Sequence, residues 1–186
     1  MIVLEKDRKI QMQPQDDTRA LVAAAKEDPV AFGKLYDRYV QSIYRYVYSR
    51  VGNASEAEDI TSQTFIAAYE SLGRYRERGL FSSWLFRIAK NKLNDHFRHS
   101  RREVGLEAEG AILEQEDALG TLIRAEELSQ IRTLIVHLSE AEQDLLRLRF
   151  VADLSYLEIA DLLGRQEDTV KKSVYRLLAR LKSQME

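Results

Sequence analysis

Polar and basic side chains share one face of a predicted helix near the carboxyl end of the chain. Asp168, Thr169, Lys172 and Arg176 all fall opposite an apolar stripe there. Ammonium and guanidinium groups pair with phosphate oxygens, and they can also donate hydrogen bonds to the edge of guanine. These residue types therefore indicate nucleic-acid binding rather than catalysis. From this stretch alone, an ordinary helical hairpin with solvated charges stays open as the alternative.

Two short helices around a tight turn would position that face. Ser155, with Glu158 three residues later, has the pattern of a capping box and predicts the start of the first helix. Gly164 supplies a residue that tolerates positive φ at its end. The second helix has one apolar face, formed by Val170, Val174, Leu177, Leu178 and Leu181. This pattern is typical of a helix-turn-helix, whose second helix lies in the major groove of duplex DNA.

The composition favours a helical protein of one or two domains. The chain has 186 residues, of which 45% are hydrophobic, with only 2 Pro and 8 Gly. The absence of Cys excludes disulfides, thiolate metal sites and a Cys nucleophile. No apolar run approaches the ~18 residues of a membrane span, and the first 15 residues contain no signal-peptide hydrophobic stretch. We expect a cytoplasmic protein with no membrane insertion.

Charge is distributed in blocks, although the net charge is only −2. Residues 71–102 contain nine Lys and Arg against two acids, and residues 103–127 contain eight acids against one Arg. Residues 165–186 contain six bases against three acids. Two basic blocks therefore flank an acidic one, which favours two nucleic-acid-binding surfaces separated by a linker.

Helical periodicity also runs through the first hundred residues. Asp28, followed by Pro29, predicts the start of a helix that continues to about Ser49. Ser55, with Glu58 at the capping-box position, predicts the start of the next helix. The side of this helix expected to be buried consists of Ala57, Ile60, Thr64, Ala68 and Leu72.

Phe65 lies off that buried side, beside Asp59, Ser62 and Gln63. We therefore expect its ring to be exposed, because an apolar side chain among polar ones can mark a protein-binding patch. A single surface aromatic, or a ring tucked under a neighbouring loop, is the alternative.

A basic loop and a basic helix follow. The loop from Gly73 to Leu80 contains Tyr75, and Ser82 or Ser83 is expected to begin the helix after it. Basic residues interleaved with aromatic ones suit single-stranded nucleic acid, because rings stack on bases and cations neutralise phosphates. The alternative is a solvated basic face over aromatic core residues, and we expect Trp84 to belong to the core.

The acidic segment reads as an extended linker, because it contains two glycines and little amphipathic pattern. A helix is expected over residues 121–137, and Ser139 with Glu142 then predicts another over 141–150. The sequence lacks a phosphate-binding Gly-rich loop and a His-Glu-x-x-His motif, and its three His are not spaced as metal ligands. We therefore expect no enzyme activity, no metal site and no cofactor.

The predicted fold is all-α, with two small helical domains joined by an acidic linker that lets them move independently. A flexible tail occupies residues 1–15, the first domain 16–102, the linker 103–120 and the second domain 121–186.

The order of these pieces resembles a known family. The runs from Phe32 to Tyr39, from Ala57 to Phe65 and from Phe81 to Asn91 resemble region 2 of extracytoplasmic-function (ECF) bacterial sigma factors. The run from Leu138 to Leu181 resembles their region 4. Region 4 alone is weakly specific, whereas both blocks in this order are highly specific. The resemblance covers roughly residues 30–100 and 130–183, nearly everything but the tail and the linker.

The resemblance implies three sets of binding residues, for an alternative sigma factor that recognises and opens promoters. Core RNA polymerase would be bound by Glu58, Asp59, Ser62, Gln63 and Phe65. The promoter −10 element would be melted and held by Arg74, Tyr75, Arg76, Phe81, Arg87, Lys90, Asn91, Asn94, Arg98 and Arg101. The −35 element would be read by Arg165, Asp168, Thr169, Lys171, Lys172, Ser173 and Arg176.

The implied partners are the β′ clamp helices and β flap of core RNA polymerase, promoter DNA and an anti-sigma factor. The linker would pass through the polymerase active-site cleft. Family members often have Ser-Arg where this chain has Lys172-Ser173, and commonly a smaller residue at Asp168, which leaves the −35 preference open. The alternatives are a stand-alone helix-turn-helix transcriptional regulator and a sigma-like interaction module that cannot start transcription.

Overall fold

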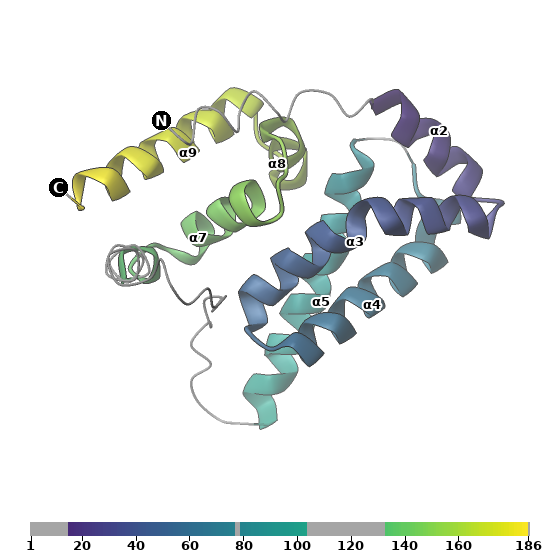
Figure 1. Cartoon of the computed structure of the whole chain (residues 1–186), viewed down its shortest axis with the longest axis horizontal. Coiled ribbons are helices and arrows are strands. Elements are labelled where there is room, and N and C mark those ends of the chain that lie inside the picture. Colours follow the sequence, from purple (N-terminus) through teal and green to yellow (C-terminus); the bar gives the residue numbers. More distant parts are fainter. Residues whose placement is uncertain (1–14, 77–78, 104–132, 186) are drawn as a thin grey trace, which may run out of the picture.

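The computed structural model describes residues 15–76, 79–103 and 133–185, and within them all regular structure is helical. This confirms the all-α class (Figure 1). Nearly all of the predicted tail and linker, and most of the predicted helix over 121–137, lie outside the described residues. Of that helix, residues 133–136 are described and are helical.

Four helices form the first group: α2 (Gln15–Ala25), α3 (Pro29–Val51), α4 (Ala54–Ser71) and α5 (Phe81–Glu103). The Asp28 carboxylate accepts the Val30 N–H at 2.9 Å and so caps α3, as its sequence predicts. Gly52 ends this helix in the left-handed region, with φ of 69°. In Figure 1, α3, α4 and α5 lie beside one another, with α2 across one end.

Helix α4 begins two residues earlier than expected. Its cap is Asn53, whose side-chain oxygen accepts the Glu56 N–H at 3.0 Å, and the predicted cap Ser55 lies inside the helix. Asparagine caps as well as serine does, and it directly follows the glycine that ends α3. A short 3₁₀ turn at Leu72–Arg74 leads into the basic loop.

The second group contains α7 (Glu140–Leu146), a π-helical turn η2 (Arg147–Val151), α8 (Tyr156–Leu163) and α9 (Glu167–Ser183). Both capping boxes are present: Ser139 with Glu142, and Ser155 with Glu158. The helix expected over 141–150 is regular only to Leu146 and then widens into η2.

The two groups pack against each other. Helix α8 contacts the N-terminal end of α5, and η2 lies against α3. One cluster of buried apolar residues includes Leu85 and Leu93 from the first group and Leu145 and Ile159 from the second. The two groups therefore share a core in this structure, a packing that the sequence does not predict. Sequence periodicity predicts which face of a helix is buried but not which distant helix covers it.

Candidate nucleic-acid interface

Helix α9 presents the predicted duplex-reading residues on its outer face. Val170, Val174, Leu177 and Leu181 are buried against α7 and α8, which confirms the predicted apolar face, and Leu178 is partly buried. Gly164 takes φ of 64° in the turn before the helix. Of the seven −35 residues, Ser173 is half-buried and the others are exposed: Arg165, Asp168, Thr169, Lys171, Lys172 and Arg176.

Two contacts fix side chains on this face. The Ser173 hydroxyl donates to the Thr169 carbonyl at 2.8 Å, and the Arg176 Nε–H donates to the Lys172 carbonyl at 3.3 Å. Arg176 therefore lies back along the helix toward its N-terminus. This end of a recognition helix is the part that approaches base edges.

Helix α5 carries the second predicted surface. Its described basic and amide residues, and those of the loop before it, are mostly exposed: Arg74, Arg76, Arg87, Asn91, Asn94 and Arg98. Arg98 pairs with Asp95 one turn before it. The side chain of Arg101 lies outside the described residues.

Two of the predicted −10 aromatics are buried. Tyr75 is 7% exposed and Phe81 is 6% exposed. They pack on each other and on Trp84, and Phe81 also contacts Tyr39. Trp84 is only partly buried at the edge of this cluster. In this structure the cluster anchors the basic loop, and its two buried rings offer no open face for a base.

Helix α4 carries the predicted polymerase-binding residues. Glu58, Asp59, Ser62 and Gln63 are exposed. Phe65 is buried instead, so its predicted exposure is wrong. Its ring is 5% exposed and contacts the ring of Tyr36 on α3, with the ring centroids 4.7 Å apart. A single-helix periodicity cannot show that a neighbouring helix covers a second face.

Sequence reasoning missed the apolar residues that α4 does expose. Ile66 is 59% exposed and Tyr69 is 49% exposed. Ile66 follows Gln63 by three residues and Asp59 by seven, so helical spacing places it on the same face as those polar residues. That spacing is the signal that points to Ile66 rather than Phe65.

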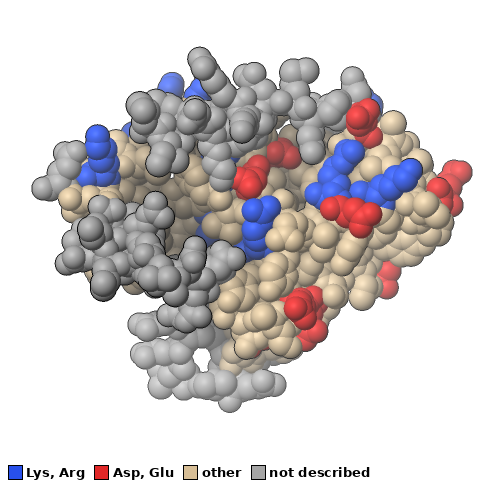
Figure 2. All heavy atoms as spheres, in the orientation of Figure 1, with Lys and Arg blue, Asp and Glu red and all other residues tan. Residues whose placement is uncertain are grey.

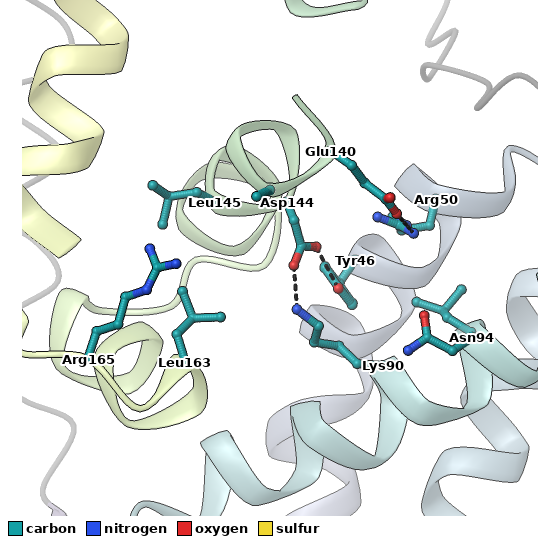
Figure 3. Close-up of a pocket in the computed structure, with 11 residues that line it drawn as sticks. Tyr46, Arg50, Lys90, Asn94, Glu140, Asp144, Leu145, Leu163 and Arg165 are labelled. Carbon is teal, nitrogen blue, oxygen red and sulfur yellow. Dashed lines mark hydrogen bonds and ion pairs between the residues drawn. The ribbon is translucent and has the colours of Figure 1, made fainter. Parts of the chain in front are cut away.

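Lys90 is the predicted −10 residue whose partner lies in the second group of helices. Its ammonium lies 2.5 Å from the Asp144 carboxylate of α7, which also accepts the Tyr46 hydroxyl of α3 at 2.7 Å (Figure 3). Asp144 is 8% exposed. Burial and the neighbouring carboxylate raise the pKa of Tyr46 well above its ordinary value of 10. One buried acid thus joins three helices.

Further polar contacts lie around this one. Arg50 pairs with Glu140 at 2.8 Å, on one side of a cavity of about 340 Å³. Arg165 and Leu163 line the opposite side (Figure 3). Among the described residues on the face seen in Figure 2, several basic side chains lie beside acidic ones, and the basic side chains form separate groups.

The described residues contain no cluster of His, Cys, Asp and Glu that could hold a metal ion. Within the same residues, no helix is both long and apolar enough to span a membrane.

The chain matches known proteins in two blocks. Residues 35–103 match the family described as Sigma-70 region 2, and residues 128–181 match Sigma-70, region 4. The ECF RNA polymerase sigma factor BldN of Streptomyces coelicolor is 37% identical over 160 residues. This match covers 81% of the chain but only 59% of BldN, so the chain spans less than two thirds of that relative.

A second relative matches over nearly its whole length. The ECF RNA polymerase sigma factor SigW of Bacillus subtilis is 33% identical over 175 residues, which cover 86% of the chain and 91% of SigW. Among solved structures, the sigma factor RpoE of Bartonella quintana in complex with the anti-sigma factor NepR has a TM-score of 0.62 and 21% identity. That match covers 83% of this chain and 96% of RpoE, and the likeness concerns the fold.

Proposed function

Because the chain belongs to the extracytoplasmic-function group of the sigma-70 family, we propose that it lends promoter recognition and promoter melting to bacterial core RNA polymerase. The observation that carries this proposal is the pair of family blocks in one chain, each with exposed polar residues at the positions that the function requires. A family member of this kind has a binding role and needs no catalytic residue of its own.

In this proposal, α9 binds duplex DNA. Its outer face combines Lys171, Lys172 and Arg176 with the short polar side chain of Thr169, and the buried opposite face holds it rigidly on α8. Such a helix fits the major groove at the −35 element, with cations on phosphates and base edges.

Helix α5 and the loop before it would hold the unpaired −10 strand. Arg87, Asn91 and Asn94 lie exposed on α5, at spacings that keep them on neighbouring faces of one helix. Guanidinium and amide groups can hold the backbone and the edges of an unpaired −10 strand. Tyr75 and Phe81 would serve here by anchoring the loop, because both are buried.

Helix α4 would bind core RNA polymerase. Asp59, Ser62 and Gln63 are exposed in the two turns before Ile66, and exposed Tyr69 lies one turn further along. An exposed apolar residue within a polar rim is the usual composition of a binding hot spot. The partner of this surface would be the β′ clamp helices, and the second group of helices would contact the β flap.

Regulation by an anti-sigma factor is part of the proposal. The solved structure of the relative RpoE holds the anti-sigma factor NepR. A partner of this kind would keep the chain from polymerase in the resting cell, in the cytoplasm where transcription occurs. Pull-down from uninduced cells that recovers polymerase but never a small protein partner would contradict this part.

Run-off transcription with purified core polymerase on a genomic library tests the function directly. We expect transcripts from a small set of promoters that core polymerase alone does not start. A stand-alone helix-turn-helix regulator would bind DNA without retaining polymerase. A sigma-like interaction module would retain polymerase and yield no transcript.

A further inference from the structure

A lysine outside the surfaces described so far contacts the loop proposed to hold the −10 strand. Lys26 lies in the turn between α2 and α3, and its ammonium donates to the Tyr75 carbonyl at 3.0 Å. The same ammonium lies 5.9 Å from the centre of the Tyr75 ring, within the range of a cation–π contact. Residue 26 precedes the block 35–103 that matches region 2. One side chain from outside that block therefore contacts both the backbone and the ring of Tyr75.

The helix before Lys26 is fixed on the first group of helices. Val22 and Ala25 of α2 are buried in the shared core. The Arg38 guanidinium of α3 donates to the Thr18 hydroxyl of α2 at 2.8 Å. Because Lys26 directly follows the last residue of α2, its side chain extends from a fixed point of the backbone.

Tyr75 joins the two ends of the basic loop. Its N–H donates to the Leu72 carbonyl at 3.0 Å, and its hydroxyl donates to the Gly79 carbonyl at 3.2 Å. Its ring is buried and packs on Phe81 and Trp84. The conformation of the loop therefore depends on where this one side chain lies.

The exposed cations of the loop flank the buried ring. The Tyr75 backbone is extended, with φ of −60° and ψ of 126°. Side chains alternate between the two sides of an extended chain, and Arg74 and Arg76 are both exposed. A displacement of Tyr75 would therefore displace both guanidinium groups.

A different contact holds the other end of the loop. The N–H of Leu80, directly before α5, donates to Asp161 Oδ2 of α8 at 2.8 Å, whereas the expected caps Ser82 and Ser83 lie buried inside α5. That contact comes from the second group of helices. The Lys26 contact comes from the first group, so it does not depend on where the second group lies.

Lys26 also keeps its positive charge available. Its side chain is exposed, and its ammonium has no carboxylate partner within the part of the chain that the structure describes. A direct contact with a DNA phosphate is therefore the alternative to a role through Tyr75.

We propose that Lys26 is a positioning residue for capture of the −10 strand. It holds Tyr75 in place, and Tyr75 in turn keeps Arg74 and Arg76 directed outward. The inference rests on the proposed function, because the loop is assigned there to the unpaired −10 strand.

Trp84 reports on this contact, since it is the single tryptophan of the chain and its ring lies 4.8 Å from that of Tyr75. Lys26→Met removes the ammonium and keeps a long side chain. We expect acrylamide to quench Trp84 roughly twofold more strongly in this variant, because local opening around Tyr75 uncovers the indole. Lys26→Arg retains a donor and should restore wild-type quenching.

Lys34→Met is the matched control for this measurement. Lys34 is an exposed lysine of α3 that makes no side-chain hydrogen bond or ion pair with a described residue. Its loss should leave the quenching of Trp84 at the wild-type value. Equal quenching in Lys26→Met and Lys34→Met would overturn the proposed hold on Tyr75.

Holoenzyme assembled from core polymerase and each variant tests the role in strand capture. The probes are a single-stranded −10 oligonucleotide from a promoter that the wild-type chain transcribes, and the same oligonucleotide with its bases shuffled. We expect Lys26→Met to lower the affinity ratio between these probes about fivefold, because misplaced guanidinium groups no longer meet base edges. Lys26→Arg and Lys34→Met should keep the wild-type ratio, and all variants should bind the −35 duplex equally.

A double-mutant comparison separates positioning from direct contact. In a chain that also carries Arg74→Ala and Arg76→Ala, Lys26 has no guanidinium left to position, so Lys26→Met should change the affinity for either probe by less than about 1.5-fold. A direct phosphate contact would instead weaken both probes alike in that chain and reduce the salt slope by about 0.7. That second result would overturn the positioning role.

These measurements also separate the inference from the function on which it rests. If the wild-type chain starts no transcript with core polymerase, the proposed function falls, and the quenching of Trp84 still decides whether Lys26 holds Tyr75. If the wild-type chain starts transcripts and Lys26→Met keeps the wild-type affinity ratio, the proposed function stands and the positioning role falls.

Discussion

The ring of Tyr36 on α3 meets the ring of Phe65 on α4 edge to face, with centroids 4.7 Å apart and 61° between their planes. Phe65 is thereby a core residue. Phe65→Ala should lower the free energy of unfolding by roughly 3–5 kcal/mol, because it leaves a cavity and removes an aromatic pair. Urea unfolding followed by circular dichroism measures this. Unchanged stability would mean that the ring is exposed in solution.

Ile66→Ala is the companion to that substitution. The side chain is 59% exposed, so its loss should change stability by less than about 0.5 kcal/mol. Affinity for core polymerase should nevertheless fall roughly fivefold or more, as expected for an anchor in a polar rim. Fluorescence titration with core polymerase tests this, and wild-type affinity would remove α4 from the proposed interface.

Tyr46 makes stability sensitive to alkaline pH. Burial and then Asp144 raise its pKa in the folded chain above the value of about 10 expected when unfolded. Its stabilising contribution is therefore fully present below pH 10 and is lost as pH rises through the folded pKa. Burial also raises the pKa of Tyr39, so both residues contribute to the loss.

The Tyr46→Phe variant isolates the contribution of Tyr46 to this loss of stability. At neutral pH this variant should be less stable by about 1–2 kcal/mol, because one Asp144 oxygen loses its donor. Above pH 10 its stability should fall less steeply than that of the wild-type chain. Denaturation midpoints across this range provide the comparison, and parallel curves would contradict the assigned cause.

Arg87 lies exposed on α5, within the surface proposed to capture the −10 strand. Arg87→Ala should slow open-complex formation on duplex promoter DNA more than on the same promoter with an unpaired −10 segment, because pre-melted DNA no longer needs capture to open. Potassium permanganate footprinting on the two templates gives the ratio. Equal losses would mean that Arg87 binds DNA without assisting melting.

We expect Lys172 to contact a base edge and Arg176 to contact a phosphate. Lys172→Ala should relax preference at one −35 position, at a cost of ~1–3 kcal/mol on the preferred sequence. Arg176 lies one turn further than Lys172 from the N-terminus of α9, so Arg176→Ala should weaken all sequences alike and reduce the salt slope by about one. Binding to −35 variants at two salt concentrations decides this. If neither substitution changes promoter affinity, α9 does not read DNA in this orientation.

Local features could be predicted from the sequence because their causes lie within a few residues. Ser139 and Ser155 each cap a helix with a glutamate three positions on. Gly164 takes the positive φ that its position requires. The buried face of α9 follows directly from its periodicity.

The misses share a different cause, which is contact between distant parts of the chain. Phe65 is buried because Tyr36 covers it, and Asp161 supplies the cap expected from Ser82 or Ser83. Nothing in the sequence distinguishes Asp144 from the other carboxylates. Its contacts with Tyr46 and Lys90 form only where three helices meet. Spacing within one helix contains no information about these partners.

The covalent connection between Glu103 and Thr133 also sets the concentration at which the two groups of helices meet. A tether of about thirty residues typically corresponds to an effective concentration in the millimolar range. A contact with only millimolar affinity would then be about half closed within one chain. The same contact between separate molecules at micromolar concentration would be almost wholly dissociated. A fragment holding only α7, α8 and α9, added in trans, would have to reach millimolar concentration to compete with its tethered counterpart.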